Sequence, residues 1–276
     1  MRVAITRGVS PGINQCELTF LPREKIDLRA ARLQHQRYEE SLKSLGCNVQ
    51  RLPVEPDLPD SVFVEDTAIV LNEVAIIARP GRGTRRQETF SVARRLVAFR
   101  SVFNIHAPGT LEGGDVLRVG NRLYAGQSDR SNAEGLRQLQ SIVDTYDYEV
   151  HPVEITKCLH LKSAVTRVGV DTLLINPSWV DKNQFTGVNL IEIHPEEPFA
   201  ANALRVGETV LYPAEYPRTR ERLEKFGIRV IAIEMSQLAK AEGGITCCSL
   251  LFHTQGSDGH VMTAYEANEI PMESTH

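Results

Sequence analysis

The chain has 276 residues, of which 42% are hydrophobic and 24% are charged, and its formal net charge at pH 7 is −4. This balance is typical of a globular protein, and no basic block suggests that it binds nucleic acid or an anionic membrane surface. No apolar run approaches the roughly 20 residues of a membrane span, and the apolar part of residues 1–7 is too short for a signal peptide.

The cysteines argue against a secreted, disulfide-bonded protein. Their number is odd and they are scattered along the chain: Cys16, Cys47, Cys158, Cys247 and Cys248. Small secreted domains carry an even, closely spaced set instead. The sequence therefore predicts reduced thiols and a cytoplasmic location.

The first hundred residues predict short strands that alternate with helices. Residues 8–18 carry glycine and proline and are expected to form a loop or lid. The helix at 84–99 has a capping pair at its start, Thr84 and Gln87. The predicted strands are 3–6, 47–52, 62–64, 67–71 and 74–78, and the predicted helices are 27–45 and 84–99.

The same pattern continues to the end of the chain. Hairpin turns are expected at Asn72-Glu73, Gly120-Asn121 and Gly207-Glu208. The predicted strands are 102–106, 115–119, 122–125, 148–153, 164–168, 172–175, 189–193, 203–206, 209–212, 228–233 and 245–252; the helical segments are 131–145, 214–226 and 235–240.

A unit of hairpin, helix and strand recurs about every 50 residues, roughly five times, which indicates a radially arranged repeat fold. We expect one α/β domain over residues 1–254. Residues 255–276 are rich in glycine, serine and glutamate and are expected to form a loosely ordered tail.

A glycine pair precedes two adjacent cysteines in Glu-Gly-Gly-Ile-Thr-Cys-Cys-Ser-Leu-Leu-Phe, residues 242–252. Glycines permit close approach of a ligand, and the apolar run behind them has the length of a strand. Side chains alternate along a strand, so Cys247 and Cys248 should point to opposite faces. We interpret Cys247 as a nucleophile that faces a cleft; the alternative is a pair of structural, buried cysteines.

Acids and a histidine occur in related contexts elsewhere. Glu65 and Asp66 stand between apolar residues, where an unpaired carboxylate is costly and would seek a cation, although two solvated acids are an equal alternative. Glu112 precedes Gly113-Gly114, and His160 lies between two leucines, where it could also be a satisfied core residue. If the repeats converge on one cavity, these residues have the nucleophile, base and orienting carboxylate of covalent catalysis.

The combination of motifs resembles the dimethylarginine dimethylaminohydrolases of the guanidino-group-modifying superfamily. The resemblance covers about residues 1–252 and depends on five motifs. They are Leu-Pro-Asp-Ser-Val-Phe-Val-Glu-Asp at 58–66, Arg-Pro-Gly with Arg85-Arg86 at 79–86, Leu-Glu-Gly-Gly-Asp-Val-Leu at 111–117, His-Leu-Lys-Ser at 160–163 and Thr-Cys-Cys-Ser at 246–249. Lys162 stands where arginine deiminases and amidinotransferases typically carry aspartate, which favours the dimethylaminohydrolase branch.

The resemblance implies a five-bladed α/β propeller of ββαβ repeats, the pentein fold, and hydrolysis of methylated arginine to citrulline without metal or redox cofactor. It assigns the nucleophile to Cys247, the acid and base to His160 and the orienting carboxylate to Glu112. The implied substrate contacts are Glu65 and Asp66 for the guanidinium, Asp60 and the Ala241 carbonyl for the α-amino group, Arg85 and Arg130 for the α-carboxylate, and Leu18 on the lid. The expected partner is a small-molecule methylarginine, and a homodimer is left open.

Three alternatives stay open at the level of sequence. The same residue types can ligate zinc, although their spacing is not that of a compact site. A non-catalytic protein that binds arginine analogues would keep the cavity. Finally, a hydrolase of this kind could deiminate free arginine, because a methyl group changes binding by only about 1–3 kcal/mol.

Overall fold

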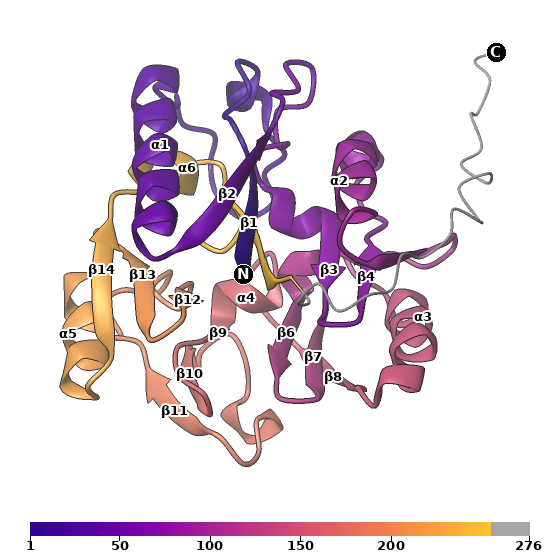
Figure 1. Cartoon of the computed structure of the whole chain (residues 1–276). Helices are drawn as coiled ribbons and strands as arrows, with labels where there is room; N and C mark the ends of the chain where they lie inside the picture. The colour runs from indigo at the N-terminus through magenta and orange to yellow at the C-terminus, as the bar shows by residue number, and fades with distance from the viewer. Residues whose placement is uncertain (255–276) are drawn as a thin grey trace.

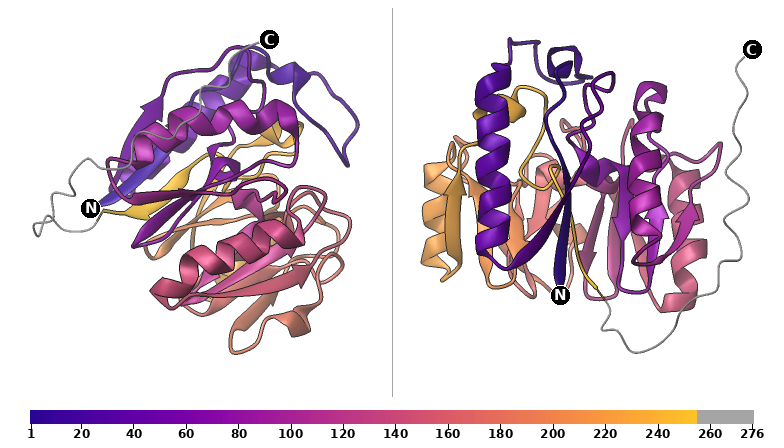
Figure 2. Two further views of the ribbon diagram at one scale, coloured as in Figure 1. Left: turned by 90° about the vertical axis from the view of Figure 1, so that its right-hand side faces the viewer. Right: turned by 45° about the horizontal axis from the view of Figure 1, so that its top comes forward.

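Five small sheets of three strands each are arranged around a central axis in the computed structural model, which describes residues 1–254 (Figure 1). The helices α1, α2, α3 and α5 lie at the periphery, outside the sheets (Figures 1 and 2). The predicted five-bladed α/β propeller is therefore confirmed. The tail predicted at residues 255–276 lies outside the described residues.

Each blade repeats the same order of strands, from the axis outward. The innermost strand pairs antiparallel with the second strand, and the second pairs parallel with the outermost. From the axis outward the strands are β15 (Leu250–His253), β1 (Arg2–Arg7) and β2 (Cys47–Leu52); β3 (Ala68–Val70), β4 (Val74–Ile77) and β5 (Ser101–Asn104); β6 (Val116–Val119), β7 (Arg122–Gln127) and β8 (Glu149–Glu154); β9 (Val165–Arg167), β10 (Thr172–Ile175) and β11 (Asn189–Glu192); β12 (Leu204–Val206), β13 (Thr209–Pro213) and β14 (Arg229–Ile233).

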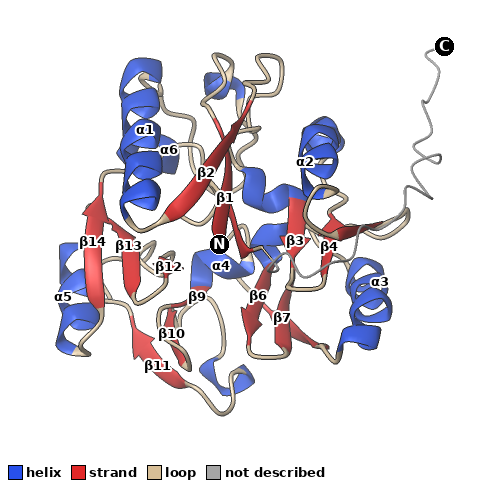
Figure 3. Ribbon diagram, in the orientation of Figure 1, coloured by secondary structure: helices blue, strands red, loops and turns tan. Residues whose placement is uncertain are grey.

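Most parallel crossovers carry a helix, as the strand geometry requires a long connection. The helices are α1 (Leu28–Ser44), α2 (Thr89–Leu96), α3 (Ala133–Val143), α4 (Leu161–Ala164), α5 (Pro217–Lys225) and α6 (Ser236–Ala239). The crossover between β10 and β11 contains only the 3-10 helix Lys182–Gln184, so this blade has no long outer helix (Figure 3).

Local sequence explains several of the element boundaries. The Asp27 carboxylate caps α1 by accepting hydrogen bonds from the backbone N–H groups of Arg29 and Ala30. Gly120 and Gly207 adopt positive φ angles of 62° and 64° in the hairpins β6–β7 and β12–β13, a conformation that costs glycine little. The hairpin turns predicted at these glycines are confirmed.

The two ends of the described chain close the ring. β15 pairs with β1, so that Ala4 lies opposite Leu251. Five hydrophobic clusters fill the spaces between neighbouring blades; one of them contains Val3 from β1, Ala75 from β4 and Val92 from α2. Because each cluster needs two blades, the blades stabilise one another around the ring.

Three predicted elements are wrong. Residues 62–64 are not a strand but lead into the 3-10 helix Val64–Thr67. The helix predicted at 84–99 begins as the 3-10 helix Gly83–Glu88, and the Thr84 hydroxyl donates to Glu17 instead of capping a helix. Residues 245–249 form turns, and only Leu250–His253 is a strand.

Within residues 1–254, no helix combines the length and the apolar character that crossing a membrane requires. All five cysteines are free thiols, as expected.

Candidate active site

The candidate catalytic residues lie just before the innermost strands of successive blades. Asp66 precedes β3, Glu112 precedes β6, His160 precedes β9, and Cys247 precedes β15. Since the innermost strands surround the axis, their starting ends bring residues separated by up to 181 positions to one place. This is the convergence that the sequence predicts.

A small cavity at this end of the axis brings together seven of the ten predicted site residues: Asp60, Asp66, Arg85, Arg130, His160, Ala241 and Cys247. Its free volume is about 10 Å³, which is about the space of one water molecule. A substrate the size of an amino acid therefore requires the surrounding segments to move.

His160 is held between two carboxylates. Its Nε2 lies 2.6 Å from Oε2 of Glu112, and its Nδ1 lies 3.7 Å from Oδ1 of Asp66. A Cβ at Gly114 would come within 2.8 Å of the His160 ring and 2.6 Å of Asp66, so glycine is required for this close approach. Glu112 is fully buried, and its carboxylate contacts the imidazole directly; its role as the orienting carboxylate stays a prediction.

These contacts favour the charged form of His160. Burial lowers its pKa, but the negative charges of Asp66 and Asp115 and the hydrogen bond to Glu112 outweigh burial and raise the pKa to about 9. Near neutral pH the residue is therefore an imidazolium, which can donate a proton to a leaving group.

Cys247 lies in the turn after Gly243-Gly244. The backbone N–H of Gly244 donates to its Sγ at 3.3 Å. Burial, followed by the negative charges of Asp66 and Glu65, raises the pKa of this thiol above its ordinary value. A cation beside the sulfur would counteract both carboxylates and favour the thiolate.

The side chains of the adjacent Cys247 and Cys248 point in different directions because both residues lie in a turn, and not because they alternate along a strand. The strand predicted at residues 245–252 therefore begins too early. The backbone N–H of Thr246 donates to the side chain of Asn202 at 3.0 Å, and this bond holds the segment in a turn. Cys247 nevertheless lines the cavity, while Cys248 has no exposed surface and packs in a core cluster.

Arg85 is engaged in ion pairs within the protein. Its Nη1 donates to Asp66 at 2.8 Å, and its Nε and Nη2 both donate to Glu88, at 3.2 and 2.9 Å. Burial lowers the Arg85 pKa, but Glu88 and Asp66 outweigh it and raise the pKa well above the ordinary value. Arg85 therefore orients Asp66 in addition to lining the cavity.

Arg130 and Asp66 keep unused hydrogen-bonding atoms. Arg130 is 1% exposed, and its Nε and Nη1 have no hydrogen-bond acceptor within residues 1–254. Oδ1 of Asp66 likewise has no donor in that part of the chain. Buried polar atoms in native proteins are normally paired, so these atoms suit a ligand that offers an anion to Arg130 and an N–H donor to Asp66.

Asp60 and Ala241 lie at the same cavity. One oxygen of Asp60 accepts the backbone N–H of Glu17 at 3.0 Å. Burial raises the Asp60 pKa, and nearby Arg85 opposes the rise. Ala241 is buried beside them.

Two predicted contact residues point elsewhere. The Glu65 carboxylate accepts from Lys162 Nζ at 2.7 Å and from the Thr246 hydroxyl at 2.6 Å, and it lines a second cavity, described below, instead of the catalytic one. Leu18 is partly buried and packs against a core cluster. Neither side chain lines the catalytic cavity in this conformation.

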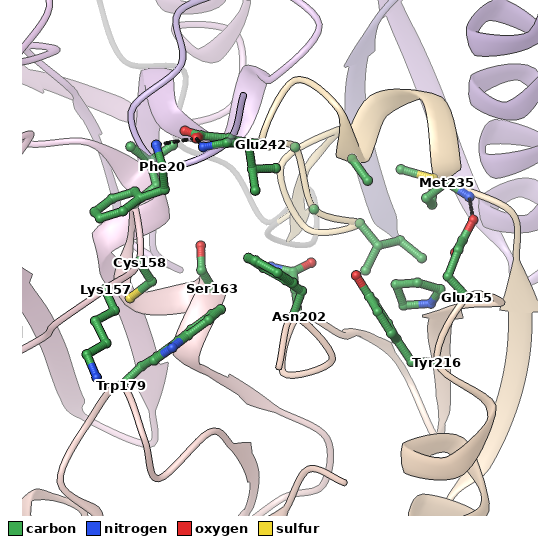
Figure 4. Close-up of a pocket in the computed structure, with 18 residues that line it drawn as sticks. Phe20, Lys157, Cys158, Ser163, Trp179, Asn202, Glu215, Tyr216, Met235 and Glu242 are labelled. Carbon is green, nitrogen blue, oxygen red and sulfur yellow. Dashed lines mark hydrogen bonds between the residues drawn. The ribbon is translucent and has the colours of Figure 1, made fainter. Parts of the chain in front are cut away.

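Glu242 fastens the backbone of residues 19–21. Its carboxylate accepts hydrogen bonds from the backbone N–H groups of Thr19, Phe20 and Leu21, with Oε1 at 3.1, 2.5 and 2.6 Å, respectively. Figure 4 shows Glu242 beside Phe20. Glu242 itself has a φ of 57°, which a residue other than glycine rarely adopts. Glu242 lines both the catalytic cavity and a neighbouring apolar pocket of about 160 Å³. Trp179 also lines that pocket (Figure 4).

Two polar residues of the site, Asp115 and Glu242, were not predicted from the sequence. Asp115 accepts from Ser128, Ser131 and the backbone N–H of Leu161, and so holds the segment that carries His160. The one sequence feature that could have indicated Asp115 is its position in the motif Leu-Glu-Gly-Gly-Asp-Val-Leu at 111–117. Glu242 could have been noticed as an acid directly before the glycine pair.

One group of possible metal ligands lies in the described part of the chain: Asp66, Glu112 and His160, with ligand atoms within 4.8 Å of one another. Arg85 Nη1 lies 2.8 Å from Asp66 and 3.8 Å from Glu112. This guanidinium already supplies positive charge to both carboxylates and would repel a metal ion. The residues therefore do not fit a metal site well.

Comparisons with known proteins agree with this geometry. The family described as eukaryotic N,N dimethylarginine dimethylhydrolase matches residues 12–253. The chain is 40% identical over 230 residues to N(G),N(G)-dimethylarginine dimethylaminohydrolase of Pseudomonas aeruginosa, covering 83% of this chain and 91% of that protein. The Streptomyces coelicolor protein of the same name is 35% identical over 248 residues, with 90% and 95% covered.

Solved structures give the same result. A cysteine-to-serine mutant of the P. aeruginosa enzyme complexed with citrulline superposes with a TM-score of 0.87 at 38% identity, covering 91% of this chain and 98% of that one. The N-terminal domain of the cyanobacterial arginine dihydrolase ArgZ has a TM-score of 0.80 at 18% identity, with 91% and 98% covered, and supports the fold alone. The chain belongs to the dimethylarginine dimethylaminohydrolases, hydrolases that act on carbon–nitrogen bonds of linear amidines.

Proposed function

We propose that the protein hydrolyses Nω-methylated arginine, namely asymmetric dimethylarginine and monomethylarginine, to citrulline and dimethylamine or methylamine. The family of the chain and the citrulline complex of its P. aeruginosa relative support this reaction. The proposal extends to a covalent mechanism in which Cys247 is the nucleophile and no metal or redox cofactor takes part.

The observation that carries the proposal is the pair of unused polar groups in one cavity. Arg130 offers two buried N–H donors, and Asp66 offers one buried carboxylate oxygen. An amino acid with a guanidinium side chain supplies both partners, because its α-carboxylate accepts from an arginine fork and its guanidinium donates to a carboxylate.

The remaining cavity residues extend the recognition of such a substrate. The Asp60 carboxylate and the Ala241 carbonyl accept hydrogen bonds from the α-amino group. Arg85, together with Arg130, donates hydrogen bonds to the α-carboxylate. The predicted roles of Glu65 and Leu18 become indirect in this conformation. Glu65 adds negative charge behind the nucleophile, and Leu18 moves with the loop of residues 8–18 when the substrate enters.

The reaction then proceeds in two halves. As the cationic substrate binds, the Cys247 proton leaves to solvent and the thiolate attacks the central guanidinium carbon. The carbon–nitrogen bond to the methylated nitrogen breaks, and His160 gives its proton to the departing amine. A thiouronium adduct with Cys247 is left.

Water completes the second half. His160, now neutral, takes a proton from water, whose oxygen attacks the adduct carbon. The carbon–sulfur bond then breaks, the remaining hydroxyl proton passes to the Cys247 sulfur, and citrulline leaves. Glu112 keeps the imidazole in place in both steps. General acid and base assistance of this kind contributes about 10²–10⁴-fold to the rate.

The test is a side-by-side assay of asymmetric dimethylarginine, monomethylarginine and arginine in the presence of EDTA. We expect citrulline and methylated amine in equal amounts from the first two substrates, and slower release of ammonia from arginine. If arginine is the best substrate, the protein is a deiminase. Binding of these compounds without any citrulline would make it a non-catalytic arginine-analogue-binding protein, and loss of activity in EDTA would contradict the metal-free mechanism.

A further inference from the structure

A second, wider cavity lies at the opposite end of the axis. It has a free volume of about 590 Å³ and is lined by the hairpin turns that follow the innermost strands, including Gly120 and Gly207. The Glu65–Lys162 ion pair lines this cavity, directly behind the catalytic residues. None of the proposed catalytic steps uses this space.

The lining is strongly cationic although the chain has a net charge of −4. Five basic side chains line the cavity, against two acidic ones, Glu65 and Glu208. The basic residues are Arg2, Arg118, Lys162, Arg167 and Arg205. The difference between five and two is a surplus of three positive charges.

Three of these arginines come from a repeated tripeptide. Arg-Val-Gly occurs at 118–120, 167–169 and 205–207, at or next to the ends of the innermost strands β6, β9 and β12. The valines are buried between blades, at 7% exposure or less. Because neighbouring side chains on a strand point to opposite faces, the arginines point the other way, and all three line the cavity.

Carboxylates neutralise only part of this charge. Glu65 pairs with Lys162 at 2.7 Å and Glu208 pairs with Arg205 at 3.0 Å. Arg2, Arg118 and Arg167 have no carboxylate oxygen within 4.0 Å among residues 1–254.

Arg167 is the least satisfied of the three. Its side chain makes no hydrogen bond in the described part of the chain, whereas that of Arg118 donates to the Gly120 carbonyl and to Asn72. Burial, followed by the positive charges of Arg205 and Arg118, lowers the Arg167 pKa; Asp171 opposes this only in part. A cluster of arginines that repel one another in a partly buried space is stabilised by a bound anion.

We propose that this cavity binds a small polyvalent oxyanion of the phosphate or pyrophosphate class, held by Arg118, Arg167 and Arg205. Guanidinium groups donate two parallel hydrogen bonds to such oxyanions, and three arginines from successive blades surround a ligand from several sides. The site is separate from the proposed hydrolase chemistry and does not depend on it.

The test is calorimetric titration of the full chain with pyrophosphate at constant ionic strength, with chloride as the balancing salt. We expect saturable binding of one pyrophosphate per chain. Arg167→Gln should weaken binding about tenfold or more, as expected for one charged hydrogen-bonding partner. Arg32→Gln is the matched control, because Arg32 is an exposed arginine on α1, away from the cavity lining.

The absence of saturable binding would overturn the proposal. Equal weakening by Arg167→Gln and Arg32→Gln would also overturn it, since it would indicate general surface attraction. Arg167→Gln removes no side-chain hydrogen bond and relieves the repulsion from Arg205 and Arg118, so its melting temperature without pyrophosphate should equal or exceed that of the unsubstituted chain. Arg205→Gln is a second variant with the same expected loss, and retained binding in both variants would also contradict the site.

Discussion

Cys247 and Cys248 are neighbours with different surroundings. Cys247 lines the catalytic cavity, and the fully buried Cys248 packs in a core cluster. We expect Cys247→Ser to abolish turnover while the protein stays folded, because a serine hydroxyl is a far weaker nucleophile than a thiolate.

Cys248→Ser is the matched control for this prediction. It should keep most of the turnover and lose about 1–3 kcal/mol of stability, since a polar hydroxyl replaces a thiol in an apolar cluster. Steady-state rates and melting temperatures of both variants check the prediction. Equal loss of turnover in the two variants would contradict the assignment of the nucleophile.

His160 makes stability depend on pH. Its pKa is raised from 6.5 to about 9 in the folded protein. A raised pKa stabilises the fold fully below pH 6.5, and this contribution, on the order of 3 kcal/mol, is lost as the pH rises through about 9. The free energy of unfolding, measured with urea across this pH range, should fall in the unsubstituted chain and fall less in His160→Gln. Equal falls in the two proteins would contradict this prediction.

At the scale of elements, Glu242 fastens the segment of residues 19–21 beside the site. Its carboxylate holds the backbone of residues 19–21, and Glu242 itself lines the catalytic cavity, which is too small for a substrate. Glu242→Gln removes the charge that strengthens these hydrogen bonds, each worth about 1.5–3 kcal/mol when charged. We expect amide hydrogen exchange at Phe20 and Leu21 to become at least about tenfold faster.

The control for this prediction is Glu221→Gln, at an exposed glutamate on α5. This variant should leave exchange at Phe20 and Leu21 unchanged. Unchanged exchange in Glu242→Gln as well would show that Glu242 does not hold the segment.

Elements determined by local chemistry could be predicted from the sequence. Asp27 caps α1 and Gly120 turns its hairpin through interactions within a few residues. The turn at 245–249 could not be predicted, because it depends on Asn202, which lies more than 40 residues away. The same holds for Glu65, whose pairing with Lys162 spans 97 residues and moves its carboxylate out of the catalytic cavity.

At the scale of the whole molecule, the repeated hairpin, helix and strand predicted five blades, and the structure has them. The repeat also predicted that the acids, His160 and Cys247 would converge, because equivalent positions of a closed ring face one axis. The homodimer and the cytoplasmic location stay predictions.

The Glu65–Lys162 pair has a consequence for the whole ring. The pair lines the wider cavity, and its acidic member contacts the catalytic segment: Glu65 adjoins Asp66 in sequence, and its backbone N–H donates to the Cys247 carbonyl at 3.1 Å. An anion that drew Lys162 toward the wider cavity would leave the negative charge of Glu65 uncompensated behind the sulfur and make the thiol harder to ionise. The ionisation of the Cys247 thiol therefore depends on where this one lysine side chain lies.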